Sequence, residues 1–139
     1  MGDSLKLVAD TSSLGSIEDF LRLWWGERGL EDQARFPFEL AIEELFVNVA
    51  THGQAVAEND VTFEITLALH QDLATTVIMT VADDGAPFDP TAKSSPDTAA
   101  PLDDRAAGGL GIHLTRSLMD RVEYSATDGR NCLRLQKRI

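Results

Sequence analysis

Two neighbouring runs of residues place the strongest limit on how this chain can fold. They are "VTFEITLALH", residues 61–70, and "TTVIMTVADD", residues 75–84, and both are dense in β-branched residues. The polar segment "QDLA" separates them, and this arrangement predicts an antiparallel β-hairpin. We therefore expect the fold to contain an antiparallel sheet.

The segments before the hairpin predict a strand and two helices. Residues 5–9, "LKLVA", alternate as a strand does, and residues 12–29, "SSLGSIEDFLRLWWGERG", space their apolar side chains at helical intervals before ending on Gly29. Residues 35–53, "RFPFELAIEELFVNVATHG", predict a second helix with Pro37 in its first turn and Gly53 at its end.

The segments after the hairpin predict a long loop, a third helix and two more strands. Residues 91–108 are rich in Pro, Ala, Ser, Thr and Asp and have little apolar periodicity, which is typical of a loop. Helical periodicity returns in "GLGIHLTRSLMD", and "RVEYSAT" and "CLRLQKRI" alternate around the turn "DGRN". This order predicts a two-layer α/β (α+β) sandwich, with helices on one face of a mainly antiparallel sheet. The length of 139 residues fits a single domain over 1–139.

Charge and composition narrow the class of protein. The chain has 12 basic and 23 acidic residues, a formal net charge of -11, which argues against nucleic acid or an anionic membrane as a partner. Its apolar runs are too short to span a bilayer, and the N-terminal residues lack the long apolar segment of a signal peptide. We therefore expect a cytoplasmic protein.

Three further residues carry structural expectations. The single cysteine, Cys132, allows no internal disulfide and has no second thiol for a zinc site, so it is predicted to be a small core residue. Trp24 and Trp25 are adjacent, and adjacent residues on a helix point in different directions. One of the two is therefore predicted to lie at an interface.

The second helix carries the first candidate for chemistry. Glu44 and Asn48 are four residues apart, so they share a face of the helix. A solvent-exposed polar face explains that spacing. Asparagine is a poor helix former, however, and its amide oxygen suits a magnesium ion that also keeps phosphate oxygens and water, while Glu44 could accept a proton. The spacing alone leaves both interpretations open.

The second candidate lies where the hairpin ends, in "VADDGAPFDP". Asp83 and Asp84 stand at the exit of a strand, and Gly85 lets another group approach the backbone closely. An ionised carboxylate only accepts hydrogen bonds, which matches an exocyclic amino group such as that of adenine. The alternative is an ordinary Asp-Asp-Gly turn with no ligand. Phe88 favours a binding site slightly, because an exposed aromatic residue in a turn usually packs over another group.

The third candidate is the string "GGLG", which contains Gly108, Gly109 and Gly111 and precedes the third helix. Glycines before a helix let backbone N–H groups converge on an anion, and the helix dipole favours a phosphate there. A flexible hinge explains the glycines equally well. Together the three candidates follow the order of a nucleotide site: a metal ligand, an adenine acceptor, a mobile cover and phosphate-binding glycines.

The segments "EELFVNVATHG", "VADDGAPFDP" and "GGLGIHLTRSLMD" resemble the N box and the two glycine boxes of the GHKL ATP-binding superfamily. The Phe-Asp-Pro sequence and "LTRSLMDRVEY" resemble the anti-sigma serine kinases of the RsbW and SpoIIAB type. The resemblance spans about residues 36–138 and implies the GHKL sandwich, with a mixed, mainly antiparallel sheet and three helices on one face. Pro87 replaces a glycine of the general superfamily, which suits the anti-sigma branch.

The resemblance also implies roles for individual residues. Asn48 corresponds to the magnesium ligand, Glu44 to the catalytic base, Asp83 to the adenine-binding aspartate and Gly85 to a support for the purine. Residues 91–108 correspond to the ATP lid. The remaining predicted cofactor-binding residues are His52, Phe88 at the start of the lid, Arg105 within it, and the phosphate-binding Gly108, Gly109 and Gly111. For His52, an interaction with the dipole at the C-terminal end of its helix is the alternative.

The function that the resemblance implies is that of a protein serine/threonine kinase that uses ATP and magnesium. It would phosphorylate an anti-anti-sigma protein of the STAS type and would alternately bind a sigma factor, and relatives commonly form homodimers. A binding module that retains ATP without transferring phosphate is an alternative. A kinase of the same chemistry that has no sigma factor as partner is another.

Overall fold

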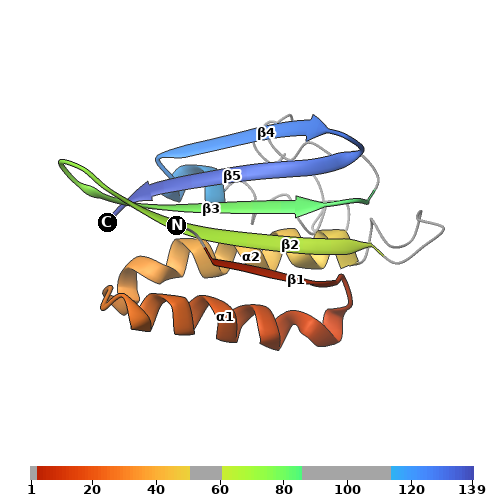
Figure 1. Cartoon of the computed structure of the whole chain (residues 1–139), viewed down its shortest axis with the longest axis horizontal. Helices are drawn as coiled ribbons and strands as arrows, with labels where there is room; N and C mark the ends of the chain where they lie inside the picture. The colour runs from red at the N-terminus through yellow and green to blue at the C-terminus, as the bar shows by residue number, and fades with distance from the viewer. Residues whose placement is uncertain (1–2, 51–60, 86–113) are drawn as a thin grey trace, which may run out of the picture.

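The computed structural model describes residues 3–50, 61–85 and 114–139. Five strands form one sheet in the order β1-β2-β3-β5-β4, and neighbouring strands are antiparallel throughout. The two long helices lie together on one side of this sheet (Figure 1). The predicted two-layer α/β sandwich is confirmed, and the described sheet is antiparallel rather than mixed.

The order of the elements is the one that the sequence predicts. Residues 114–118 are helical, whereas Gly53 and the predicted start of this third helix lie outside the described residues. The bounds are β1 (Asp3–Val8), η1 (Thr11–Ser13), α1 (Leu14–Glu27), η2 (Asp32–Arg35), α2 (Phe36–Asn48), β2 (Thr62–Gln71), β3 (Thr75–Asp83), β4 (Arg121–Thr127) and β5 (Arg130–Arg138).

The β2–β3 hairpin supplies the centre of the sheet. Every second residue faces the helices, because successive side chains of a strand point to opposite faces. Phe63 of β2 meets Phe46 of α2 edge-on, with ring centroids 5.2 Å apart. The other buried apolar residues of the hairpin that face the helices are Ile65, Leu67, Val77, Met79 and Val81.

Helix α2 packs against the sheet through one apolar stripe and carries polar residues beside it. Pro37 occupies its first turn, as predicted, because that turn leaves backbone N–H groups unpaired in any case. The stripe consists of Phe38, Ala41, Ile42 and Phe46, which are all buried.

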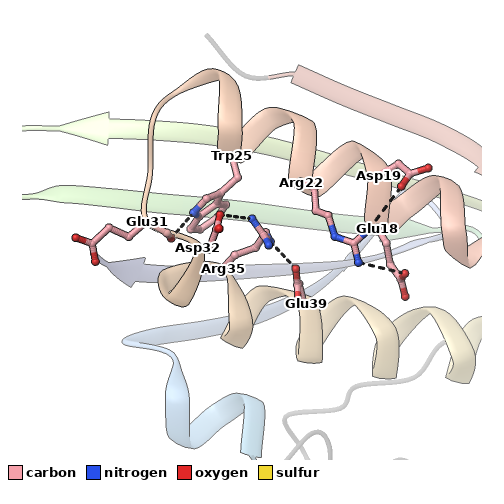
Figure 2. Close-up of polar contacts among 8 residues, drawn as sticks. All are labelled: Glu18, Asp19, Arg22, Trp25, Glu31, Asp32, Arg35 and Glu39. Carbon is pink, nitrogen blue, oxygen red and sulfur yellow. Dashed lines mark hydrogen bonds and ion pairs between the residues drawn. The ribbon is translucent and has the colours of Figure 1, made fainter.

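The prediction that one of the two tryptophans lies at an interface is wrong. Trp24 is 2% exposed and Trp25 is 0% exposed. The chain turns back after α1 through Gly29, whose φ is 64°, and the returning backbone encloses Trp25. Its Nε1 donates a hydrogen bond to the carbonyl oxygen of Glu31 at 2.8 Å (Figure 2). Its ring lies 5.5 Å from that of Phe38.

Trp24 is buried by a different set of contacts. The guanidinium of Arg28 lies 4.3 Å from the centre of its ring, and Arg28 also forms an ion pair with Asp3 of β1 at 2.7 Å. Both tryptophans can therefore be buried on one helix because the loop after α1 covers one and Arg28 covers the other.

The segment between the two helices is held by a second arginine. Arg35, at the end of η2, contacts Asp32 at 3.0 Å and also Glu39 one turn into α2 (Figure 2). The Arg35 side chain is 16% exposed and that of Glu39 is 35% exposed, whereas that of Asp32 is 86% exposed. The contact with Glu39 is therefore less screened by solvent than the contact with Asp32. The loop that covers Trp25 is thus tied to the start of α2.

Replacing Trp25 with phenylalanine should lower the free energy of unfolding by about 2 kcal/mol, because the ring becomes smaller and the hydrogen bond to Glu31 is lost. Urea denaturation measures this change. Leu23→Ala on the same helix is the control, since Leu23 is 65% exposed. The sedimentation coefficient of Trp25→Phe should stay that of the wild type, and a change of oligomeric state would contradict the buried position.

Cys132 is half-buried rather than part of the core. It lies opposite Ala82 in the pairing of β3 with β5. Because Leu133 and Leu135 face the helices, the alternation of β5 turns Cys132 to the other face of the sheet. The prediction of a small core residue is therefore wrong.

Candidate functional site

Glu44 and Asn48 lie in the last two turns of α2, beside its buried stripe, and both are half-buried. The neighbouring Glu43 is exposed. Burial raises the pKa of the Glu44 carboxyl above its ordinary value, and the negative charge of Glu43 raises it further. A carboxylate with a raised pKa is a stronger proton acceptor than an ordinary surface glutamate, so this side of α2 is suited to proton transfer.

Asp83, the last residue of β3, is an acidic side chain on the helix-facing side of the sheet and is 8% exposed. Its Oδ1 accepts a hydrogen bond from the backbone N–H of Gly85 at 2.9 Å and another from Nδ2 of Asn131 at 3.0 Å. Among the described residues, no donor reaches its second oxygen, Oδ2. One oxygen of a buried carboxylate is therefore held by the protein while the other can accept a hydrogen bond from a ligand.

The adjacent Asp84 has a structural role. It is exposed, and its Oδ1 accepts a hydrogen bond from the backbone N–H of Thr62 at 2.6 Å. Its own N–H donates to the carbonyl oxygen of Thr62 at 3.3 Å. Asp84 thus fastens the end of β3 to the start of β2, and only Asp83 of the pair faces inward.

The environment of Asp83 shifts its acidity in opposing directions. Burial is the largest influence and raises the pKa of the carboxyl, and the nearby charge of Asp84 raises it as well. The hydrogen bonds from Asn131 and Gly85 and the positive charge of Arg130 act the other way. The net result is a raised pKa, which is common where a polar group serves a binding site.

The sequence reasoning missed Asn131 and Tyr124. Asn131 is 8% exposed and lies directly opposite Asp83 in the pairing of β3 with β5. Its Oδ1 accepts a hydrogen bond from the Tyr124 hydroxyl at 2.6 Å. The sequence does carry a signal for Asn131, because it lies two residues before Leu133 and alternation turns both side chains inward. The pattern "DGRN" also predicts a turn, and that interpretation hides the signal.

Several predicted site residues lie outside the described residues. They belong to the segments 51–60 and 86–113, so their predicted roles stay predictions. The residues are His52, Phe88, Arg105, Gly108, Gly109 and Gly111, and the predicted lid over 91–108 falls in the same segment.

The described part of the site joins two elements. The C-terminal ends of α2 and β3 lie at the same end of the molecule (Figure 1). Asn48 is the last residue of α2, in the helix layer, with Glu44 one turn before it, and Asp83 is the last residue of β3, in the sheet. Hard oxygen ligands, a proton acceptor and an acceptor for an amino group are thus present at one end of the sandwich.

The described residues contain neither a cluster of metal ligands nor a membrane-spanning helix. No group of three or more His, Cys, Asp or Glu side chains in residues 3–50, 61–85 and 114–139 is arranged to hold a metal ion. No described helix has the length and apolar character needed to cross a membrane.

Known proteins resemble this chain along nearly its whole length. A family model for the histidine kinase-like ATPase domain matches residues 7–137. The serine/threonine-protein kinase BtrW of Bordetella bronchiseptica is 34% identical over 136 residues, which cover 95% of this chain and 87% of BtrW.

A solved structure has the same fold. The crystal structure of the RsbU and RsbW domains of Rv1364c from Mycobacterium tuberculosis aligns with a TM-score of 0.68 at 18% identity. The alignment covers 99% of this chain and 32% of the solved chain, so this chain spans about a third of that protein.

The comparisons confirm the predicted resemblance to the GHKL superfamily. The family model spans almost every residue, and the alignment with BtrW covers both sequences nearly end to end. The chain belongs to the histidine kinase-like ATPase domain family.

Proposed function

We propose that this chain is a protein serine/threonine kinase and anti-sigma factor that uses ATP and magnesium. It would phosphorylate an anti-anti-sigma protein of the STAS type and sequester a sigma factor. The observation that carries the proposal is the carboxylate of Asp83, which is 8% exposed and has one oxygen left to accept a hydrogen bond. The similarity to the kinase BtrW supports the reaction.

Adenine would bind at the end of β3. The exocyclic amino group of adenine donates hydrogen bonds, and Oδ2 of Asp83 is an acceptor in a water-poor environment, where such a bond is stronger than in water. Gly85 follows two residues later and lacks a side chain that would obstruct the purine. Phe88, which is predicted to begin the lid, would then lie close to the base.

The phosphates would lie between α2 and the predicted glycine turn. The amide oxygen of Asn48 is a hard ligand, and magnesium commonly takes one or two protein oxygens in addition to phosphate oxygens and water. The single amide of Asn48 fits this need without a cluster of carboxylates. His52, Arg105, Gly108, Gly109 and Gly111 are proposed to complete the binding of the nucleotide, with residues 91–108 as the lid.

Glu44 is proposed as the base for transfer. A seryl hydroxyl must lose its proton as the bond between its oxygen and the γ-phosphorus forms and the bond to ADP breaks. Glu44 would take that proton, and its raised pKa brings it nearer to the ideal for a base at neutral pH. Magnesium, when bound, would neutralise charge on the phosphates.

The regulatory part of the proposal concerns partners. If the anti-anti-sigma protein and the sigma factor compete for this chain, adding a phosphate to the former changes its charge and shifts the exchange. A single domain over 1–139, a possible homodimer and a cytoplasmic location belong to the same proposal. The family model over residues 7–137 supports the single domain.

Isothermal titration with a non-hydrolysable ATP analogue tests the nucleotide and magnesium site. Magnesium should strengthen binding to the wild type, and Asn48→Ala should weaken binding in magnesium by roughly tenfold, because the metal loses a protein ligand. The conservative Asn48→Asp keeps an oxygen ligand and should retain the effect of magnesium. Val47→Ala is the control on the exposed side of α2. If magnesium strengthens binding to Asn48→Ala as much as it does to the wild type, Asn48 is not the magnesium ligand.

A further inference from the structure

Three polar side chains from three neighbouring strands form a chain of hydrogen bonds beneath the predicted base site. The hydroxyl of Tyr124 on β4 lies 2.6 Å from Oδ1 of Asn131 on β5, and Nδ2 of Asn131 lies 3.0 Å from Oδ1 of Asp83 on β3. Asn131 and Asp83 are both 8% exposed, and Tyr124 is half-buried. Hydrogen bonds in such surroundings fix the orientation of the groups that form them.

Chemistry determines the direction of every bond in this chain. An ionised carboxylate can only accept, so the amide of Asn131 must turn its NH₂ group toward Asp83. Its carbonyl oxygen then faces the other way, where the hydroxyl of Tyr124 donates to it. The same NH₂ group is 3.4 Å from the carbonyl oxygen of Gly85, the residue that also donates its N–H to Asp83.

We propose that Tyr124 is a positioning residue for nucleotide selection. Acting through Asn131, it holds the Asp83 carboxylate with Oδ1 bound to the protein and Oδ2 directed at the amino group of adenine. This inference rests on the proposed function, since it assigns a role to the residues behind the adenine acceptor.

Removing the hydroxyl of Tyr124 should reduce the preference for adenine over guanine. Without the donor on Tyr124, the amide of Asn131 loses one of the contacts that keep its NH₂ group turned toward Asp83. The hydrogen bond to the ionised carboxylate is then weaker, which favours the protonated carboxyl. A protonated carboxyl donates, and a donor matches the carbonyl oxygen of guanine at the place where adenine has its amino group. The charges of Asp84 and Arg130 also act on Asp83, and neither is changed by this substitution.

The test compares Tyr124→Phe with Ser125→Ala. Each loses one hydroxyl group from β4, but Ser125 is exposed and lies on the other face of the sheet. Isothermal titration with ADP and with GDP gives the affinities. Tyr124→Phe should bind ADP roughly fivefold more weakly than the wild type does, which corresponds to the loss of one ordinary hydrogen bond, and its preference for ADP over GDP should narrow. Ser125→Ala should match the wild type.

A double-mutant cycle separates positioning from a merely structural role. Asn131→Leu removes the amide at similar size, and adding Tyr124→Phe to it should change ADP affinity less than twofold, because Tyr124 acts through Asn131. Additive losses would overturn the proposal. So would wild-type affinity and selectivity in Tyr124→Phe.

A measurement without nucleotide distinguishes this inference from the proposed function. Carboxyl carbon NMR should show a higher pKa for Asp83 in Tyr124→Phe than in the wild type, with Ser125→Ala unchanged. If the wild type binds no ADP, the proposed function fails together with base selection. An unshifted Asp83 titration in Tyr124→Phe would overturn the positioning role whether or not the wild type binds ADP.

Discussion

Replacing Asp83 with asparagine should weaken ADP binding by about 100-fold, which corresponds to the loss of a strong hydrogen bond to a charged acceptor. The protein already uses Oδ1 for Gly85 and Asn131, so the ligand depends on a second acceptor oxygen. An asparagine has one oxygen and one NH₂ group. Whichever way it turns, a donor then faces either Asn131 or adenine.

Asp84→Asn is the matched control for this experiment. It removes the same charge from the adjacent residue, which is exposed and binds the backbone of Thr62. ADP affinity should stay within about twofold of the wild type, because that carboxylate is exposed to solvent and binds the backbone of Thr62. Its thermal midpoint should fall, since the bond that fastens β2 to β3 is weakened.

Isothermal titration measures both variants, and near-ultraviolet circular dichroism checks that each is folded. An affinity for ADP in folded Asp83→Asn equal to that of the wild type would refute the adenine assignment. Equal losses in the two variants would mean that only the total charge at this end of the molecule matters.

Glu44→Gln should lower the rate of phosphate transfer by a factor of about 100 to 10,000 while leaving ATP affinity nearly unchanged. A glutamine keeps the size of the side chain but cannot accept the proton of the seryl hydroxyl. The assay follows radiolabelled γ-phosphate from ATP to purified STAS-type proteins of the same organism. Single-turnover conditions keep product release from masking the chemical step.

Glu43→Gln is the matched control, because Glu43 is adjacent and exposed. Its transfer rate should stay close to that of the wild type. Equal rates in Glu44→Gln and the wild type would remove Glu44 from the reaction. Nucleotide binding by a wild type that transfers no phosphate to any of the STAS-type proteins would favour the binding module over the kinase.

The Glu44→Gln variant also tests the electrostatics of α2. The pKa of Glu44 is raised in the folded protein, so ionisation of this carboxyl opposes folding above its unfolded pKa, near the ordinary value of 4.5. Glu44→Gln should therefore be more stable than the wild type at neutral pH, and the difference should disappear as the pH falls below about 4.5. Urea denaturation at pH 7 and pH 4 measures it.

The site residues that could be predicted from the sequence are those that short-range sequence patterns mark. Alternation along β3 ends at Asp83, and the helical repeat places Glu44 and Asn48 one turn apart, so short-range periodicity was enough to find them. The motifs in chain order then led to the family. The roles of His52, Arg105 and the glycines remain predictions, because they fall outside the described residues.

The tertiary structure decided what depends on contacts between distant segments. Trp25 is buried because the chain returns through η2 and covers it, which helical spacing alone does not reveal. Asp83 and Asp84 have the same side chain, and only the strand pairings separate the buried acceptor from the surface clamp. Asn131 meets Asp83 across 48 residues of sequence. Cross-strand register fixes such meetings, and register is set by the packing of the whole sheet rather than by neighbouring residues in the chain.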